Sequence, residues 1–209
     1  YRGCHCLYRQ AEPCGEQSRK TLKEKNRLLR IYGCKSKEIT WPAGVEAGDV
    51  LLGLASDGVH SNGYSLIRKV LEIAAEQSID GRPAADALLE PTRIYVKPVL
   101  ALMASTQVKG LAHITGGGIS ENVPRMLPAN VHARIDTSTW EQGPVFDWLA
   151  GHGNIATDEM RRTFNCGVGM IVTVAASDAD AAVATLAEHG ETAWRIGDVA
   201  EGAGPVVYS

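Results

Sequence analysis

The chain has 209 residues, of which 44% are hydrophobic and 22% are charged, and its formal net charge at pH 7 is −3. No stretch reaches the ~18 apolar residues of a membrane-spanning helix, and no apolar secretory segment opens the sequence. The slightly acidic balance argues against a dedicated nucleic-acid-binding protein, which is normally basic. We therefore expect a cytoplasmic globular protein with no membrane or nucleic-acid partner, whose core needs no disulfide or metal ion.

Charge and cysteine are distributed unevenly along the chain. Residues 1–40 contain ten Lys and Arg against four Asp and Glu, a net charge of +6, and four of the five cysteines. Residues 41–209 contain eleven Lys and Arg against twenty Asp and Glu, a net charge of −9. This difference predicts an irregular basic leader at 1–40 and one folded domain at 41–209.

The leader allows several interpretations. Residues 18–30 could form a short basic helix, but its apolar stripe is too thin to build a core. A zinc site is a second possibility, although the spacing of Cys4 and Cys6 does not match the C-x2–4-C pairs of structural zinc sites. A basic arm for nucleic acid is a third. We favour a solvated, poorly ordered segment without disulfides, since the sequence shows no export signal.

From residue 41 onward, short apolar segments alternate with amphipathic ones. The run VLLGLA at 50–55 has no polar residue, which is typical of a strand buried on both faces. Strands are predicted at 50–55, 111–114, 131–135, 167–174 and 194–199. Helices are predicted at 64–77, 145–150 and 178–189. Another is predicted at 92–104, with a kink or break at Pro98, and one more follows the segment 115–118 and runs through residue 126. This alternation predicts an α/β fold, a single domain with helices packed on a mixed sheet.

The first candidate functional motif is SDGVHSNGYS, residues 56–65, between a predicted strand and a predicted helix. Its two glycines allow a ligand to approach the backbone closely, and the free N–H groups of a helix start attract anions. The same residue types also dominate ordinary turns, and the pattern alone does not separate the two readings. His60 could act as a general acid or base near neutral pH, or could be structural.

The second motif is HITGGGISEN, residues 113–122, where three glycines separate a strand from a helix. Consecutive glycines cost backbone entropy, so they indicate unusual dihedral angles or close approach of a ligand, with phosphate as the favoured guest. Thr115 could add a hydroxyl donor. The motif matches neither G-x4-G-K-[ST] nor G-x-G-x-x-G, and a flexible turn is the alternative.

The third motif, RRTFNCGVGM at 161–170, places two arginines and Asn165 before a strand. These residues could orient an anion, but a surface turn is the favoured interpretation. Cys166 has no neighbouring histidine in the sequence, which favours a buried inert thiol over a nucleophile. The sequence contains no G-x-S-x-G, H-E-x-x-H or C-x-x-C motif, so hydrolase and zinc-protease readings lack support.

The chain resembles a known family in four segments that occur in this order: GLASDGVHSNGYSLIRKVLE, LLEPTRIYVKPVL, AHITGGGISENVPRMLP and MRRTFNCGVGM. Over about residues 44–209 it is similar to the C-terminal half of the phosphoribosylformylglycinamidine cyclo-ligases, or AIR synthetases. The resemblance implies an ATP-dependent ligase of purine biosynthesis. Such an enzyme closes the imidazole ring of formylglycinamidine ribonucleotide and yields aminoimidazole ribonucleotide, ADP and phosphate.

The resemblance also implies roles for residues of the three motifs. The histidine-bearing motifs of the family fall on His60 and His113, which we expect to be catalytic because ring closure needs proton transfers. The substrate carries a ribose phosphate, and its expected contacts are Ser56, Gly58, Ser61, Asn62, Gly63, Thr115, Gly116, Gly117, Gly118 and Asn165.

Family members also have an N-terminal α/β domain that supplies much of the dimer interface and the acidic, glycine-rich segments that hold Mg–ATP. Residues 1–40 resemble no part of it, so the implied ATP and Mg2+ are expected to bind mainly outside this chain, and no metal ligand is assigned within it. Expected partners are the ribonucleotide and either a second copy or a chain that carries that domain. Two alternatives stay open: a paralogous enzyme such as formylglycinamidine ribonucleotide synthetase, and a non-catalytic phosphate- or nucleotide-binding domain.

Overall fold

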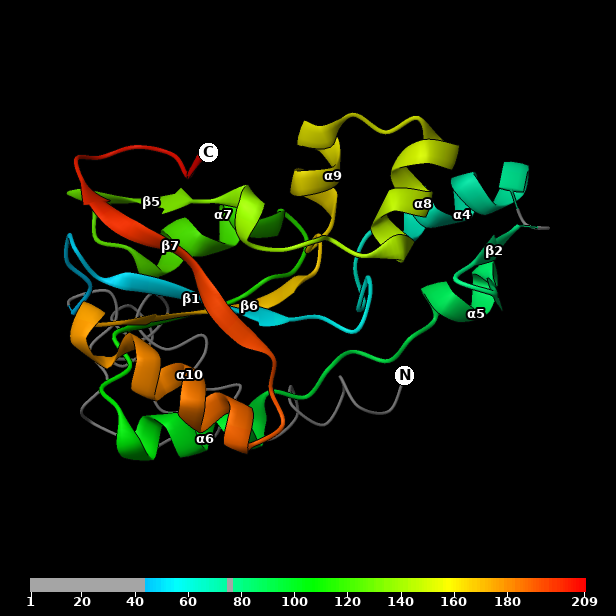
Figure 1. The fold of residues 1–209 in the computed structure, drawn as a ribbon. Helices are drawn as coiled ribbons and strands as arrows, with labels where there is room; N and C mark the ends of the chain where they lie inside the picture. Colours follow the sequence, from blue (N-terminus) through cyan, green and yellow to red (C-terminus); the bar gives the residue numbers. More distant parts are fainter. Residues whose placement is uncertain (1–43, 75–76) are drawn as a thin grey trace, which may run out of the picture.

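The computed structural model describes residues 44–74 and 77–209, so the predictions for the leader lie outside the described residues. The main sheet contains β1 (Val50–Ala55), β4 (Gly110–His113), β5 (Val131–Ile135), β6 (Val168–Val174), β7 (Ala193–Glu201) and β8 (Val207–Tyr208). Their order is β4-β6-β1-β7-β5-β8 (Figure 1). All neighbours are antiparallel except β5 and β8, which are parallel, so the sheet is mixed as predicted.

The two central strands β6 and β1 are almost completely buried. All seven residues of β6 are buried, as are residues 50–54 of β1. Helices α6 (Val96–Ser105) and α10 (Ala179–Glu188) pack against each other below the sheet in Figure 1. The short helix α7 (Gly118–Asn122) is drawn between β5 and β1 in Figure 1, and the 3-10 helix η2 (Val123–Met126) that follows it contacts β4 and β5. These layers exclude water from both faces, which accounts for the continuous apolar run of β1.

A second apolar core lies beyond one end of the sheet, at the right of Figure 1. Ile67 and Val70, at helical spacing, pack there with Phe146 and Leu149. Phe146 meets Phe164 edge-on, with ring centroids 6.2 Å apart. The elements of this helical core are α4 (Tyr64–Ala74), β2 (Ser78–Ile79), β3 (Arg82–Pro83), α5 (Ala84–Leu88), α8 (Pro144–Gly153) and α9 (Thr157–Thr163).

The structure corrects several sequence-based predictions. The helix predicted at 92–104 begins at Val96, and Pro98 neither breaks nor divides it. Pro98 falls in the first turn of α6, where backbone N–H groups have no partner within the helix. Because proline lacks this N–H, its presence there costs the helix no hydrogen bond. The strand predicted to close the sheet, β7, is followed by β8, which pairs with β5. The sequence also missed α5, α9 and the β2–β3 hairpin, because segments of seven residues or fewer give little periodicity.

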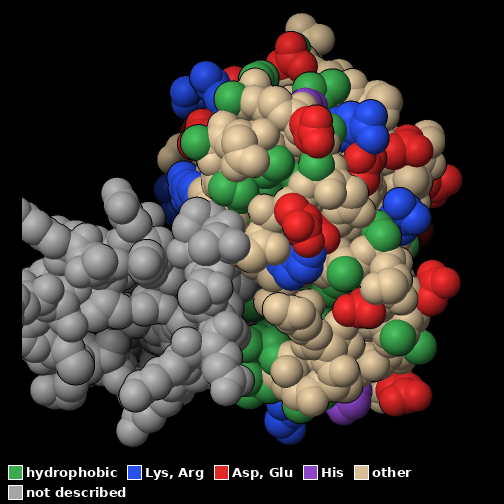
Figure 2. Space-filling model, turned by 90° about the vertical axis from the view of Figure 1, so that its left-hand side faces the viewer, with side chains coloured by type: hydrophobic (Ala, Val, Ile, Leu, Met, Phe, Trp, Pro, Cys, Tyr) green, Lys and Arg blue, Asp and Glu red, His purple; other side chains and the backbone are tan. Residues whose placement is uncertain are grey.

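The short connecting 3-10 helices η3 (Thr137–Thr139) and η4 (Ala176–Asp178) complete the described elements. Figure 2 shows the left-hand face of Figure 1, where basic and acidic side chains of the described residues are interspersed and form no single basic patch. Within the described ranges, no helix is both long enough and apolar enough to cross a bilayer.

Candidate functional site

The three predicted motifs meet at one edge of the main sheet. Residues 56–63 follow β1, residues 114–117 follow β4, and residues 164–167 precede β6. Because β6 is antiparallel to both β1 and β4, its first residues lie beside the last residues of those two strands. The strand order therefore brings together segments that are far apart in the sequence.

Asn165 joins the first loop to the third. Its side chain is buried, with the residue 1% exposed. Oδ1 accepts hydrogen bonds from Ser56 Oγ and from the Gly167 N–H, both at 2.9 Å, and Nδ2 donates to the Gly58 carbonyl at 2.8 Å. Three of the predicted substrate contacts, Ser56, Gly58 and Asn165, are thus bonded to one another. This geometry gives Asn165 a positioning function within the loops.

The glycine run is bonded to the same network. The Gly116 N–H donates to Asn62 Oδ1 at 3.0 Å, which links the second loop to the first. The Gly117 N–H donates to the Arg162 carbonyl at 2.9 Å, and the Gly118 N–H donates to a carbonyl within the loop. A phosphate bound by these N–H groups would have to replace one of these bonds.

Asn122 fixes the other side of the glycine run. It is buried, and its Nδ2 donates to the Gly118 carbonyl at 2.8 Å and lies 3.3 Å from the carbonyls of Thr115 and Gly116. Its Oδ1 accepts from the Thr115 hydroxyl at 3.3 Å and from Arg125 at 3.0 Å. The sequence reasoning did not single out Asn122, although it lies in the quoted motif. The loop is held in one conformation from both sides.

The glycines of the first two loops have different structural roles. Gly118 has φ +58°, and a Cβ there would overlap the backbone carbonyl of Arg161. Gly63 has φ +75°, and a Cβ there would overlap the ring of Phe164. A Cβ at Gly116 would meet nothing closer than 3.9 Å. Gly118 and Gly63 therefore permit close packing, whereas Gly116 leaves open space beside the loop.

His60 is buried beneath the first loop and has a left-handed backbone conformation, with φ +55°. Its Nε2 accepts the N–H groups of Asp57 at 3.3 Å and Arg93 at 3.5 Å, so the neutral ring carries its proton on Nδ1. Nδ1 has no hydrogen-bond partner among the described residues. Burial, followed by the charges of His113 and Arg93, lowers the pKa of His60 to about 4.

Tyr95 lies between the two histidines that the sequence singled out. Its ring centroid is 6.3 Å from that of His60 and 6.4 Å from that of His113. The Tyr95 hydroxyl donates to the Ala55 carbonyl at 2.6 Å. Burial also lowers the pKa of His113. The structure thus brings His60 and His113 together, and both imidazoles are neutral near pH 7.

Arg93 is a further component of this edge that the sequence reasoning missed. Its guanidinium pairs with Asp57 at 3.0 Å and with Glu191 at 2.9 Å, and donates to the Gly190 carbonyl at 3.2 Å. It therefore connects the first loop to the turn before β7. The signal available in the sequence was the segment LLEPTRIYVKPVL, which the resemblance contained and the motif reading left unused.

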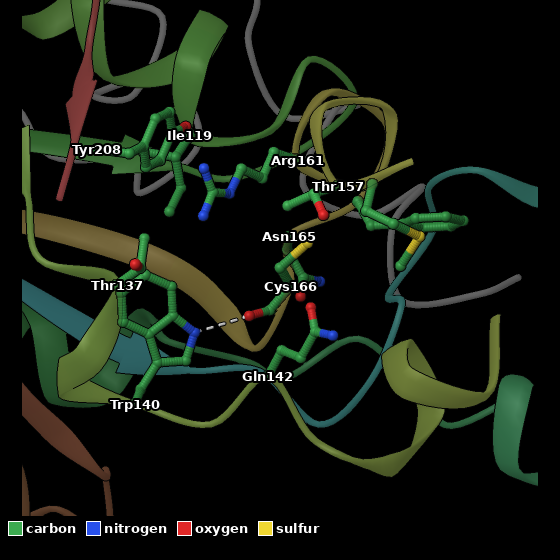
Figure 3. A pocket seen from close by; sticks show the side chains of 11 residues that line it. Ile119, Thr137, Trp140, Gln142, Thr157, Arg161, Asn165, Cys166 and Tyr208 are labelled. Carbon is green, nitrogen blue, oxygen red and sulfur yellow. Dashed lines mark hydrogen bonds between the residues drawn. The ribbon is translucent and has the colours of Figure 1, made fainter. Parts of the chain in front are cut away.

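The third motif begins inside a helix, not in the predicted surface turn. Arg161 and Arg162 lie in the last turn of α9, and Arg162 pairs with Glu159. Cys166 is buried, as predicted, and burial raises the pKa of its thiol to about 12, which favours an unreactive thiol. Arg161 and Cys166 border a cavity that Ile119 of α7 and Tyr208 of β8 also line (Figure 3).

The remaining predicted contact, Ser61, is exposed and lies 3.1 Å from the Thr92 hydroxyl. Within residues 44–74 and 77–209, no three His, Cys, Asp or Glu side chains gather closely enough to hold a metal ion.

The burial of neutral His60 predicts a pH dependence of stability. The ordinary histidine pKa of 6.5 falls to about 4 in the folded state, so the unfolded chain binds the extra proton first as the pH falls. Between pH 7 and pH 4.5 the free energy of unfolding should decrease by about 2 kcal/mol on account of His60. Urea unfolding of the wild type and His60→Gln at both pH values measures this. The variant should lack about 2 kcal/mol of the pH dependence, and identical pH dependence would contradict a neutral, buried His60.

Comparison with known proteins gives a family match over most of the described chain. A family model described as the C-terminal domain of AIR synthase related proteins matches residues 46–209. A phosphoribosylformylglycinamidine cyclo-ligase of Burkholderia vietnamiensis is 57% identical over 158 residues, which cover 74% of this chain and 45% of that protein. One of Methylobacillus flagellatus is 54% identical over 164 residues, covering 77% and 47%. The chain spans about half the length of the curated relatives it matches.

Solved structures show the same architecture at much lower identity. The thiamine-monophosphate kinase from Stenotrophomonas maltophilia K279a superposes with a TM-score of 0.53 and 19% identity, over 83% of this chain and 54% of that one. At this identity the likeness shows a shared fold. It confirms the predicted class, an α/β domain with helices on a mixed sheet.

Proposed function

Because this chain belongs to the AIR synthase related proteins, matching their C-terminal domain, we propose that it is the ribonucleotide-binding part of a phosphoribosylformylglycinamidine cyclo-ligase. The observation that carries this proposal is the convergence of three motif loops around His60, Tyr95 and His113. These loops are cross-linked by Asn165 and Asn62, in a chain 57% identical to a cyclo-ligase. The proposal includes a domain at 41–209, a separate leader at 1–40 and a cytoplasmic location.

Substrate would bind along the open side of the glycine run. Gly116 has space beside it, and Asn62, whose Oδ1 accepts the Gly116 N–H, also carries an Nδ2 group that could donate to a phosphate oxygen. Thr115 and Ser61 supply hydroxyl groups on the same two loops. Because the loops are already fixed, little ordering entropy would oppose binding.

The two histidines would have different roles. His60 Nδ1–H is a buried donor without a described partner, which suits a hydrogen bond to a substrate oxygen or nitrogen. With a pKa near 4, His60 would not exchange protons at neutral pH. His113 is neutral and less buried, so it would accept the proton that the attacking nitrogen loses as the ring closes.

ATP and Mg2+ belong to the proposed reaction of the whole enzyme. We assign their binding mainly to a domain outside the described residues, and every role given above to His60 and His113 concerns the ribonucleotide alone. A domain that provides them, in the same protein or in a partner, would complete the reaction.

Binding of formylglycinamidine ribonucleotide by the purified chain tests the proposal. Calorimetry should detect binding, and the melting temperature should rise with ligand concentration. Asn62→Ala should weaken binding at least tenfold, whereas Arg162→Gln, a surface change on α9, should alter it less than twofold. Absence of binding to the folded wild type would refute the proposal.

A ring-closure assay with ATP and Mg2+ then separates binding from catalysis. If the chain forms aminoimidazole ribonucleotide, His113→Gln should slow turnover by about 100-fold or more at unchanged affinity. If the chain binds substrate without turnover, it is a substrate-binding half that needs the ATP-binding domain.

A further inference from the structure

We propose that the cavity between α7, α9 and β8 is a second binding site, for a flat heteroaromatic ring that carries one phosphate or carboxylate group. The cavity has a volume of about 280 Å³, near the lower end of small-molecule sites at ~300 Å³. Its apolar wall includes Ile119, Met160 and Phe164. The proposal does not depend on the proposed function, because the glycine run and the two histidines do not line this cavity.

The positive charge of Arg161 in the cavity lining favours an anionic ligand. Arg161 alone is charged among the described residues that line the cavity, and none of the described carboxylates lies within ion-pairing distance of its guanidinium. The nearby Glu159 is engaged by Arg162 and by the Thr163 hydroxyl. Figure 3 shows the Arg161 guanidinium directed into the space between Tyr208 and Cys166. An arginine held this way offers paired N–H donors to a phosphate or carboxylate.

The position of Arg161 is fixed by stacking. Its guanidinium carbon lies 4.5 Å from the centroid of the Tyr208 ring, a cation–π contact that leaves the N–H edge available. Tyr208 is held in turn by a 2.7 Å hydrogen bond between its hydroxyl and that of Ser120. A preorganised cation loses less entropy when an anion binds than a freely rotating surface arginine does.

The indole of Trp140 supplies a flat surface for the ring. Its Nε1 donates to the Cys166 carbonyl at 2.9 Å, and Cys166 has a left-handed backbone conformation, with φ +47°. A non-glycine residue pays about 1 kcal/mol or more for that conformation, and here the conformation orients the carbonyl that fixes Trp140. At the edge, Gln142 Nε2 donates to Asp147, and its Oε1 faces the cavity in Figure 3. That oxygen can accept an N–H of a heterocycle.

Asn165 belongs both to the lining of the cavity and to the motif loops of the candidate site, but its polar atoms point away from the cavity. They bond to Ser56, Gly58 and Gly167, as described above. The three glycines of the run do not line the cavity, and Gly118, the first residue of α7, packs directly on the backbone of Arg161. The two sites therefore share a wall but not their ligand-facing groups.

Calorimetry with three ligands on the full chain tests the second site. AMP combines a ring with one phosphate, adenosine has the ring alone, and inorganic phosphate has the anion alone. AMP should bind, and the other two should bind at least tenfold more weakly. Arg161→Gln should weaken AMP binding at least tenfold, whereas Arg68→Gln, an exposed position on α4 with the same loss of charge, should change it less than twofold. Circular dichroism verifies that both variants are folded.

Three results would overturn the second site. One is the absence of AMP binding to the wild type. Another is equal affinity for AMP and inorganic phosphate, because the ring would then contribute nothing. The third is AMP binding that Asn62→Ala abolishes and Arg161→Gln leaves intact, since the nucleotide would then occupy the glycine loops. Loss of AMP binding in Arg161→Gln with formylglycinamidine ribonucleotide binding intact would support the second site and separate it from the proposed function.

Discussion

Replacing Gly118 with alanine is expected to lower the free energy of unfolding by about 3–4 kcal/mol. The new Cβ would overlap the carbonyl oxygen of Arg161, a backbone atom that cannot rotate away, and φ +58° disfavours any residue with a Cβ. Relief requires α7 and α9 to separate, which would disturb the hydrogen bond from Gly117 to the Arg162 carbonyl. Equilibrium urea unfolding measures the change.

Gly116→Ala is the matched control from the same run of glycines. A Cβ at Gly116 would meet nothing closer than 3.9 Å, so its effect on stability should stay within about 0.5 kcal/mol. If both variants lose the same stability, the close packing of α7 on α9 is not the reason for Gly118. If Gly116→Ala keeps its stability but binds formylglycinamidine ribonucleotide less tightly, the open side of the loop is the ligand side.

Asn165→Ala is expected to cost about 3 kcal/mol of unfolding free energy. The substitution removes three hydrogen bonds and leaves the Gly58 carbonyl and the Gly167 N–H without this partner in a buried place. Chemical denaturation at pH 7 measures the loss. Because the side chain joins two loops, weaker binding of the ribonucleotide should accompany it.

Ser56→Ala provides the comparison for Asn165. It removes one of the three bonds and should cost about 1 kcal/mol. Equal losses in the two variants would mean that the Asn165 amide does not hold the loops together, and the candidate site would lack its main cross-link.

The pattern of hydrogen bonds changes how the glycine motif should be understood. A run of three glycines suggests free N–H groups that await a phosphate, but all three N–H groups are bonded within the protein. Gly118 permits helix packing, and Gly116 leaves an opening. Sequence reasoning could identify the loop as unusual, yet the separate roles of its glycines depend on which atoms face each position.

Local patterns predicted the main elements of the sheet well. β1 and β5 have the predicted bounds, and β6 begins one residue later than predicted, because apolar runs and alternation directly reflect the burial of each strand. The pattern failed at β8 and α9, which are short and owe their conformation to partners that are distant in the sequence.

The sequence by itself determined the class of the fold, its family and the three loops at which chemistry is expected, because these are recorded in residue types and spacing. Only the tertiary structure decided how the loops are joined. Asn165 lies 107 residues from the carbonyl it binds, and Arg93 lies 98 residues from Glu191. Such contacts depend on the order and direction of strands, since β6 between β1 and β4 sets which loop ends meet. No local pattern contains that information.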